Sequence, residues 1–322
     1  MSFSSLPIID LNDDESKIIT SIFQACSTTG FFYVRNHRLD DAQQRMFRLA
    51  KEFFQLPSNI KEQYLIDKQN HGYVRRGQEN LDSTKKNAID EKEAFNIGKF
   101  NESNRLPECF ARSDNFHLIK QFINDCYNLC MKLLVYLARS FEIKSDYFTT
   151  RHQWDLQSGD TLRLLHYPAV ITQQSDDAIR AGAHSDYGSL TLLFQHDHKS
   201  GLEVLDRSNN IWYPVEPYED MIVVNFGDAM EYWSKGLIKS TVHRVTMPVV
   251  IDSAKENERY SIAYFCHPND ATLLTPVPSK FVRDRTFDKD EHAKHALDDS
   301  ENQETLTAGQ HFQMRLNKTY TY

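Results

Sequence analysis

The stretch Ala181-Gly-Ala-His-Ser-Asp-Tyr-Gly-Ser-Leu-Thr-Leu-Leu193 sets His184 and Asp186 two residues apart, next to a β-branched and apolar run. Successive side chains of a strand point to opposite faces, so we expect these two to emerge on one face, within reach of a single ion. A jelly roll could bring a third candidate alongside, His243, from a strand-like segment over residues 239–247. Two imidazoles and one carboxylate form the facial triad of non-haem iron(II) oxygenases, which leaves positions open for substrate and O2.

The spacing by itself does not decide between a metal site and ordinary packing. A single histidine in a strand is more often a hydrogen-bonded core or edge residue than a metal ligand. His196 and His198 form a rival cluster, but the turn-forming Lys199-Ser-Gly201 that follows predicts an exposed hairpin loop for them. A structural zinc site would close the open positions. Support must therefore come from the rest of the chain.

A second pattern lies further along the chain, in the segment Arg259-Tyr-Ser261. The period of two puts Arg259 and Ser261 on one face of a strand, with Tyr260, Ile262 and Tyr264 on the other. A guanidinium with a neighbouring hydroxyl could hold the far carboxylate of a dicarboxylic acid, whose 2-oxo acid end would chelate the iron. The alternative is that Arg259 pairs with a carboxylate of the protein.

The predicted secondary structure changes at about residue 155, from mainly helices to mainly strands. Before it we expect helices near residues 14–29, 40–56 and 115–141 and short strands at 6–10 and 30–34. After it, short β-rich runs separated by turns predict a sandwich or barrel. These runs cover residues 161–167, 190–195, 202–205, 221–226, 240–247 and 259–266. A polar segment at 289–303 indicates a surface helix or partial disorder.

Composition restricts the class of protein and its surroundings. With 322 residues, a formal net charge of −8 and no dense Lys/Arg patch, the chain does not favour a nucleic-acid partner. No apolar run is long enough to span a bilayer, and the first residues do not read as a signal peptide. The five scattered cysteines argue against a disulfide framework. We expect a cytoplasmic protein, with a nuclear location also compatible, that is a monomer or weak oligomer.

Several ordered segments together resemble one family. LPIIDL, CSTTGFFYVRNH, FFQLP and KEQY are similar to the helical N-terminal region of the isopenicillin N synthase-like 2-oxoglutarate and iron(II)-dependent oxygenases. GAHSDYGSLTLLFQ, GLEVLD, VVNFGDAMEYWSKGLIKSTVHRV and ERYSIAYFCHP follow its catalytic core in order. By this resemblance His184, Asp186 and His243 match the family's iron ligands, and Arg259 with Ser261 matches its carboxylate-binding pair.

The resemblance implies a fold and an activity. The fold would be mainly β with flanking helices: a helix-rich region over 1–150, a double-stranded β-helix (jelly roll) core over 151–280 and a C-terminal segment over 281–322. The enzyme would be a dioxygenase using Fe(II), 2-oxoglutarate and O2, with ascorbate as an accessory reductant. It would hydroxylate or desaturate a small organic metabolite and release succinate and CO2, with the protein holding the open metal geometry.

The chain also departs from the family pattern. Tyr167 matches a tyrosine near the co-substrate, but Leu165 stands where asparagine is common and Ala169 where proline is frequent. Two alternatives therefore stay open: a 2-oxoglutarate-independent iron oxidase of the same fold, and a non-catalytic β-barrel binding protein. Arg38 replaces the usual glycine of a turn.

Three aromatic residues are candidates for the substrate pocket, with ordinary core packing as the alternative. They are Tyr73, Phe95 and Phe265. Sequence patterns do not identify the substrate.

Overall fold

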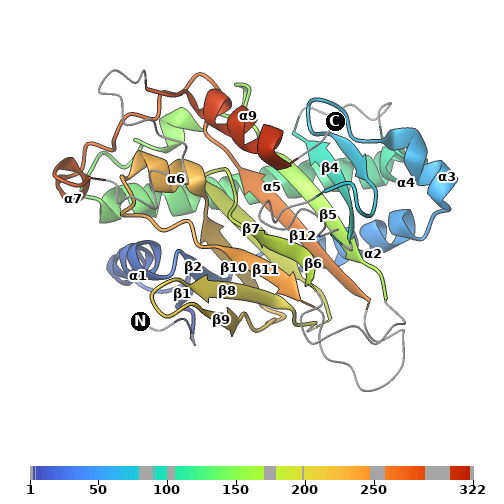
Figure 1. The fold of residues 1–322 in the computed structure, drawn as a ribbon, viewed down its shortest axis with the longest axis horizontal. Coiled ribbons are helices and arrows are strands. Elements are labelled where there is room, and N and C mark those ends of the chain that lie inside the picture. The colour runs from blue at the N-terminus through green and yellow to red at the C-terminus, as the bar shows by residue number, and fades with distance from the viewer. Residues whose placement is uncertain are drawn as a thin grey trace.

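Two facing β-sheets form the centre of the molecule (Figure 1). The computed structural model describes residues 3, 5–79, 90, 92–99, 106–169, 179–197, 199–246, 258–286 and 305–319. The larger sheet has eight strands in the order β1-β2-β10-β7-β12-β5-β4-β3, and the smaller has four in the order β6-β11-β8-β9. Every pairing of the last eight strands, β5 to β12, is antiparallel.

These eight strands are divided between the sheets in the manner of a jelly roll, alternating except for the consecutive pair β8 and β9, which confirms the predicted fold class. The larger sheet takes β5 (Thr161–Tyr167), β7 (Leu190–Gln195), β10 (Met221–Phe226) and β12 (Arg259–Cys266). The smaller sheet takes β6 (Ile179–His184), β8 (Leu202–Asp206), β9 (Ile211–Pro214) and β11 (His243–Thr246). Chain reversal between strands thus carries residues far apart in sequence onto facing surfaces.

The N-terminal region widens the larger sheet at both edges. Strand β1 (Ile8–Asp10) pairs in parallel with β2 (Phe31–Arg35), which continues the sheet beyond β10. At the other edge β4 (Glu93–Gly98) pairs with β5, and β3 (Gly72–Val74) pairs with β4. The first half of the chain is therefore part of the same sheet as the core.

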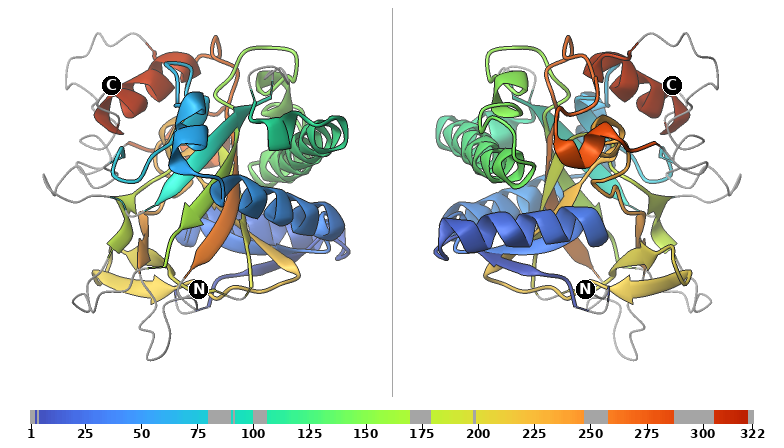
Figure 2. Two further views of the ribbon diagram at one scale, coloured as in Figure 1. Left: turned by 90° about the vertical axis from the view of Figure 1, so that its right-hand side faces the viewer. Right: turned by 90° about the vertical axis from the view of Figure 1, so that its left-hand side faces the viewer.

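Long helices cover one face of the larger sheet, while the smaller sheet lies on the other side (Figure 2). Helices α1 (Glu15–Thr28), α2 (Asp40–Phe54) and α5 (Ser113–Ser140) are the predicted ones, within two residues at every end. Helix α5 packs against β7 and β12, as its apolar stripe requires. The shorter helical segments are α3 (Ser58–Lys61), η1 (Glu62–Tyr64), α4 (Glu108–Ala111), η3 (Thr149–Arg151), α6 (Asp228–Trp233), α7 (Lys280–Arg283) and α9 (Ala308–Thr319).

Sequence patterns predicted some of the strands and missed others. The ranges of β5, β7, β10 and β12 match the prediction residue for residue, because these strands are buried and strongly apolar on one face. Strands β3, β4 and β9 were missed, and β6 was expected only around its last residue, His184, since these strands are short or mix charged and small residues. The predicted polar segment at 289–303 lies outside the described residues.

Two smaller predictions are also decided by the structure. Cys126 and Cys130 are fully buried on α5, and all five cysteines are unpaired. Arg38 adopts φ 64°, so the turn keeps the left-handed conformation that glycine normally supplies. None of the described helices has the length and apolarity to cross a membrane.

Candidate active site

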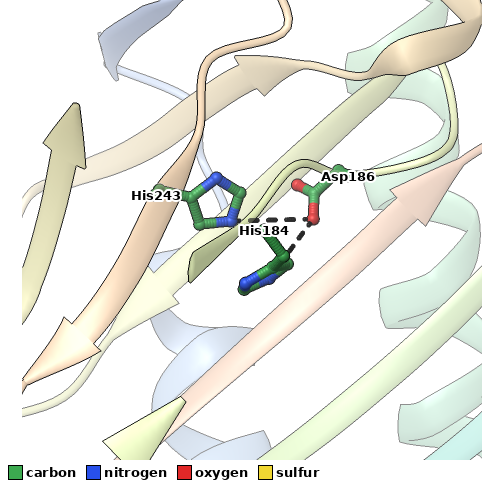
Figure 3. Close-up of side chains that lie close together, drawn as sticks. All are labelled: His184, Asp186 and His243. Carbon is green, nitrogen blue, oxygen red and sulfur yellow. Dashed lines mark ion pairs between the residues drawn. The ribbon is translucent and has the colours of Figure 1, made fainter. Parts of the chain in front are cut away.

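His184, Asp186 and His243 converge between the two sheets (Figure 3). His184 ends β6 and His243 begins β11, and the two are register partners in the smaller sheet. Asp186 Oδ1 lies 4.0 Å from His184 Nε2 and 3.7 Å from His243 Nε2. One ligand atom from each residue lies within 4.8 Å of the others, which is a spacing that one metal ion can bridge.

The expectation that His184 and Asp186 share a strand face is wrong. Strand β6 ends at His184, and Asp186 belongs to the turn that leads to β7. This turn docks on the start of α6, where Asp228 N donates to Asp186 O at 2.7 Å and Gly227 N donates to Ser189 O at 3.1 Å. A Cβ on Gly227 would meet Gly188 O at 2.4 Å, so the close approach requires glycine there. The turn, rather than the strand period, aims the carboxylate.

Both histidines are held in the tautomer that a metal needs. Nδ1 of His184 donates to Gly182 O at 2.7 Å, and Nδ1 of His243 donates to Thr241 O at 3.2 Å. With the proton on Nδ1, the lone pair of Nε2 points toward Asp186 and the space between them. Burial lowers the pKa of His184 to about 4, and the nearby His243 adds to this, so the neutral ligand form is present at neutral pH.

The carboxylate of Asp186 is oriented by two buried donors that the sequence interpretation missed. Asn225 Nδ2 and Thr191 Oγ1 both donate to Oδ2, at 2.7 and 2.6 Å, which leaves Oδ1 facing the histidines. Burial opposes ionisation, but the imidazoles of His243 and His184 and these two hydrogen bonds together hold the pKa of Asp186 below its usual range. The sequence does contain a signal for Asn225, because it is the polar residue of an otherwise apolar strand and lies on the face that points to the cavity.

Arg259 lies in the same cavity, on β12. The side chain is buried, its Nη2 donates to Gln195 Oε1 at 3.2 Å, and its Nη1 lies 3.5 Å from Ser261 Oγ. Among the described residues no carboxylate pairs with it, so the alternative of an internal ion pair finds no support there. Burial lowers the pKa of this guanidinium, which is the expected effect on a cation held without a counter-charge.

Tyr167 and Leu165 occupy the facing positions of β5. Tyr167 is the register partner of Arg259, whose guanidinium carbon lies 5.1 Å from the Tyr167 ring centroid. Leu165 pairs with Ser261 and also lines the cavity, so the departure from the family pattern puts an apolar side chain beside the hydroxyl. The three predicted carboxylate-binding residues are thus brought together at one end of β5 and β12.

Of the three predicted pocket residues, one lines the cavity and two lie in the apolar core. Phe265 lines the cavity, two positions beyond Ala263 on the same face of β12 as Arg259. Tyr73 and Phe95 do not line it: they pack on Phe53 in the apolar core, with ring centroids 5.8 and 4.8 Å away. As register partners of β3 and β4, they share the sheet face that the helices cover. The rival His196 also packs on this side, stacked on Phe47, while His198 lies outside the described residues.

A charged wall that the sequence did not suggest completes the cavity. Glu79, Lys92 and Arg163 all line it and are buried, and Lys92 lies 2.6 Å from Asp90 and 3.1 Å from Glu79. Arg163 Nη2 lies 2.6 Å from Glu79 Oε2. Among the described residues, the two cations are each paired with a carboxylate, so this wall offers both donors and acceptors.

A jelly roll that holds two histidines and one carboxylate in an internal cavity, with a buried arginine beside them, defines a non-haem metal-dependent oxygenase. Comparison with known proteins gives the family. Residues 6–117 match the model described as non-haem dioxygenase in morphine synthesis N-terminal, and residues 158–268 match the 2OG-Fe(II) oxygenase superfamily. The chain belongs to the 2-oxoglutarate and iron(II)-dependent oxygenases, in their isopenicillin N synthase-like branch.

Individual relatives are similar over nearly their whole length. A UPF0676 protein of Schizosaccharomyces pombe is 33% identical over 100% of this chain and 95% of its own. A proline hydroxylase of Petromyces alliaceus is 30% identical over 95% and 94%. A full-length Neurospora crassa protein crystallised in complex with alpha-KG is 30% identical, covers 97% of this chain and 96% of its own, and superposes with a TM-score of 0.79. The activity is therefore that of a dioxygenase that uses Fe(II), 2-oxoglutarate and O2 on small molecules.

Proposed function

We propose that His184, Asp186 and His243 bind Fe(II), and that Arg259, Ser261 and Tyr167 bind the distal carboxylate of 2-oxoglutarate. The observation that carries this assignment is that one cavity contains both the three-ligand cluster and a buried arginine with no carboxylate partner among the described residues. A buried guanidinium is stabilised by an anion that accepts its hydrogen bonds, and a dicarboxylic acid that also reaches the metal would supply one.

Each residue has a distinct part in such a reaction. Bound iron, with 2-oxoglutarate and O2, supplies an oxidant for C–H bonds while the co-substrate becomes succinate and CO2. Gly182 and Thr241 carbonyls keep the two imidazoles from rotating, and Asn225 and Thr191 keep one oxygen of Asp186 on the metal side. Arg259 fixes the orientation of the co-substrate through its planar fork of donors.

The substrate is a small organic metabolite with both a flat or apolar part and a polar edge. Aromatic side chains, including Phe265 and Tyr187, line the cavity together with the charged wall of Glu79, Lys92 and Arg163. A polar edge would satisfy the donors and acceptors of that wall, while the rest of the molecule is held by apolar contact. Its product would be hydroxylated or desaturated.

Two small molecules named for similar proteins provide the first probes. The Neurospora crassa protein has also been crystallised with alpha-KG and thymine, in a structure at 29% identity and a TM-score of 0.78. The Petromyces alliaceus relative is named a proline hydroxylase. Both thymine and proline are small molecules with adjacent donors and acceptors, so each fits the general character of this cavity.

The test is a coupled screen with the iron-loaded protein, 2-oxoglutarate and air. Thymine, proline and fractions of a metabolite extract would each be added while succinate is measured, with His243→Ala as the matched inactive control. A substrate should raise succinate formation well above the rate without it and give a product heavier by one oxygen or lighter by two hydrogens. Succinate formation that is equal in the wild type and in His243→Ala would refute the metal assignment.

We also place the protein in a reducing compartment, the cytoplasm. All five cysteines are free thiols, with no disulfide among them, which is the pattern typical of proteins in a reducing compartment.

A further inference from the structure

Helix α9 closes one side of the cavity that holds the His-Asp-His cluster. Phe312 and Leu316, one helical turn apart on α9, both line this cavity. The Phe312 ring centroid lies 4.5 Å from that of His267, which follows β12. In Figures 1 and 2, α9 (red) lies at the end of the molecule opposite β1. The helix is therefore a wall of the site rather than a surface appendage.

The start of α9 is fixed by backbone and capping hydrogen bonds. Ala308 N donates to Thr272 O at 2.8 Å, and Gly309 N donates to Asp270 O at 3.0 Å. Thr307 and Gln310 form a reciprocal capping box, with each side chain accepting from the backbone N–H of the other. These contacts hold the first turn but not the turns that carry Leu316.

Arg315 holds the later turns of α9. Its Nη2 lies 2.9 Å from Asp228 Oδ2 and 3.4 Å from Ser185 Oγ, and its guanidinium carbon lies 5.0 Å from the Tyr187 ring centroid. Ser185 stands between two of the metal-ligand residues, and Tyr187 follows the second of them. One side chain of the closing helix thus contacts both neighbours of Asp186.

Asp228 joins α9 to both segments that carry metal ligands. Its Oδ2 accepts from Ser185 Oγ at 3.1 Å and its Oδ1 accepts from Ser240 Oγ at 2.7 Å, three residues before His243. The Asp228 side chain is 0% exposed, and Arg315 is the partner whose charge opposes its own in the contacts described above. Displacement of Arg315 would remove this ion pair and the contact with Ser185 Oγ, so the turn at residues 185–189 should become less well held.

Phe312 also separates two spaces. The inner cavity contains the metal-ligand residues, and an outer, more polar groove is lined by Lys68, His71, Asp160 and Asp270. Phe312, Gly159 and Thr161 line both. A Cβ on Gly159 would come within 2.8 Å of the Phe312 ring, so the ring packs directly on the backbone of residue 159, where there is no side chain. Phe312 thus lies between the outer groove and the inner cavity.

We propose that Arg315 is a positioning residue, which fastens α9 over the site through Asp228, and that Phe312 controls passage from the outer groove to the inner cavity. The substrate contacts of Phe312 and Leu316 rest on the proposed function, but the fastening of α9 does not. Arg259 begins β12, and His267, which contacts α9, follows the end of that strand. Eight residues at about 3.3 Å each span roughly 25 Å, so the co-substrate end of the cavity is remote from α9.

Hydrogen–deuterium exchange on the metal-free protein tests the fastening directly. Arg315→Gln should raise exchange at α9 amides at least tenfold and at residues 185–189 measurably, while α5 stays unchanged. Exchange at α9 in Arg315→Lys, which keeps the charge, should fall between that of the wild type and that of Arg315→Gln. Asn317→Ala, on the exposed side of the same helix, is the matched control and should behave as wild type. Exchange in Arg315→Gln equal to that of Asn317→Ala would overturn the proposal.

A double-variant comparison tests the pairing with Asp228. Arg315→Gln combined with Asp228→Asn should exchange no faster at α9 than the faster of the two single variants, because both remove one interaction. Additive effects would show that the two residues act separately and would contradict the pairing. If the Asp228 variant does not fold, the comparison of Arg315→Gln with Arg315→Lys decides the question.

Release of Fe(II) to the bulky chelator 1,10-phenanthroline tests passage through the groove. Phe312→Ala and Arg315→Gln should each release iron several-fold faster than wild type, with the affinity for 2-oxoglutarate within about twofold. Unchanged release in Phe312→Ala would refute the role of Phe312. If the wild type binds no iron, the proposed function fails, and the exchange measurements still decide whether Arg315 fastens α9.

Discussion

The two faces of the larger sheet differ in chemistry although the same strands build both. On β12, Tyr260, Ile262 and Tyr264 pack into the helix-covered core, while Arg259 and Ser261 face the cavity. The covered face holds an aromatic cluster beside the buried Lys61–Glu93 ion pair. The cavity face holds Arg259, Ser261 and the paired Arg163, and it lies opposite the His-Asp-His cluster, whose two histidines belong to the smaller sheet. Substitutions on one face should therefore change stability, and those on the other should change binding and turnover.

The largest effect is expected on the cavity face, at the metal cluster. Loss of partners that merely orient metal ligands costs about 10- to 100-fold, so Asp186→Ala, which removes a ligand, should lower turnover by more than about 100-fold. Thermal unfolding of the metal-free variant should show a loss of about 1–3 kcal/mol for each of the Asn225 and Thr191 donors left unpaired, which is measured separately from turnover. Succinate formation and calorimetry on the same sample measure both, and turnover above a tenth of wild type would contradict the assignment.

On the covered face the expected effect is on stability. Ile262 is fully buried in the core, so Ile262→Ala should lower the free energy of unfolding by about 2–5 kcal/mol. The folded fraction should bind 2-oxoglutarate with nearly the wild-type affinity. Urea denaturation measures the free energy of unfolding, and titration of the same preparation measures the affinity for 2-oxoglutarate. A tenfold loss of affinity with unchanged stability would contradict the assignment of this face to stability.

A histidine of the core provides a further contrast with the ligand histidines. His152 has both ring nitrogens occupied, by Phe148 O at 2.7 Å and Ser189 Oγ at 2.8 Å, and burial lowers its pKa to about 4. Its ordinary value is about 6.5, so between pH 6.5 and 4 the unfolded chain binds a proton that the folded chain does not. Stability should therefore fall as the pH is lowered through this window.

The size of this pH effect is measurable by difference. His152 contributes up to about 1.4 kcal/mol per pH unit, so His152→Phe should have a correspondingly shallower dependence of unfolding free energy on pH. Denaturation series at several pH values between 4 and 7 measure the two slopes. Equal slopes would show that His152 is not buried in its neutral form.

The smallest effect is expected from restoring the family residue at position 165. Leu165→Asn would place an amide opposite Ser261 at the co-substrate end of the cavity. One additional hydrogen bond contributes a net 0.5–1.5 kcal/mol, or roughly a two- to tenfold gain in affinity for 2-oxoglutarate. Isothermal titration under anaerobic conditions resolves this range, and weaker binding would mean that leucine fits this pocket better.

Sequence patterns predicted the strands whose covered face is apolar and the helices with a continuous apolar stripe. They also brought together His184, His243 and Arg259, since period-two alternation and ordered family motifs carry that information. They did not predict the turn that aims Asp186, because its geometry depends on Asp228 and Gly227 from a distant segment. Tyr73 and Phe95 show the same limit: nothing local distinguishes an aromatic residue of the core from one of a pocket.

The cavity residues that sequence patterns did not predict lie outside the family motifs. No sequence pattern marks Glu79, Lys92 and Arg163 as cavity residues: Arg163 reaches the cavity from β5, and Lys92 immediately precedes the paired strand β4. Arg315 lies on a short amphipathic helix with no recognisable motif. Long-range packing, which one sequence does not reveal, decides these positions.

The most direct test of the central claim is an anaerobic titration of the Fe(II)-loaded protein with 2-oxoglutarate, followed by the visible charge-transfer absorption of a metal-bound 2-oxo acid. Arg259→Gln is compared with Arg244→Gln, a matched change at an arginine that pairs with Glu203 and stacks on Trp212. The wild type and Arg244→Gln should saturate alike, and Arg259→Gln should bind roughly 10- to 100-fold more weakly, because a charged hydrogen bond is lost. Equal affinity in all three proteins, or iron binding with no absorption band, would contradict the account.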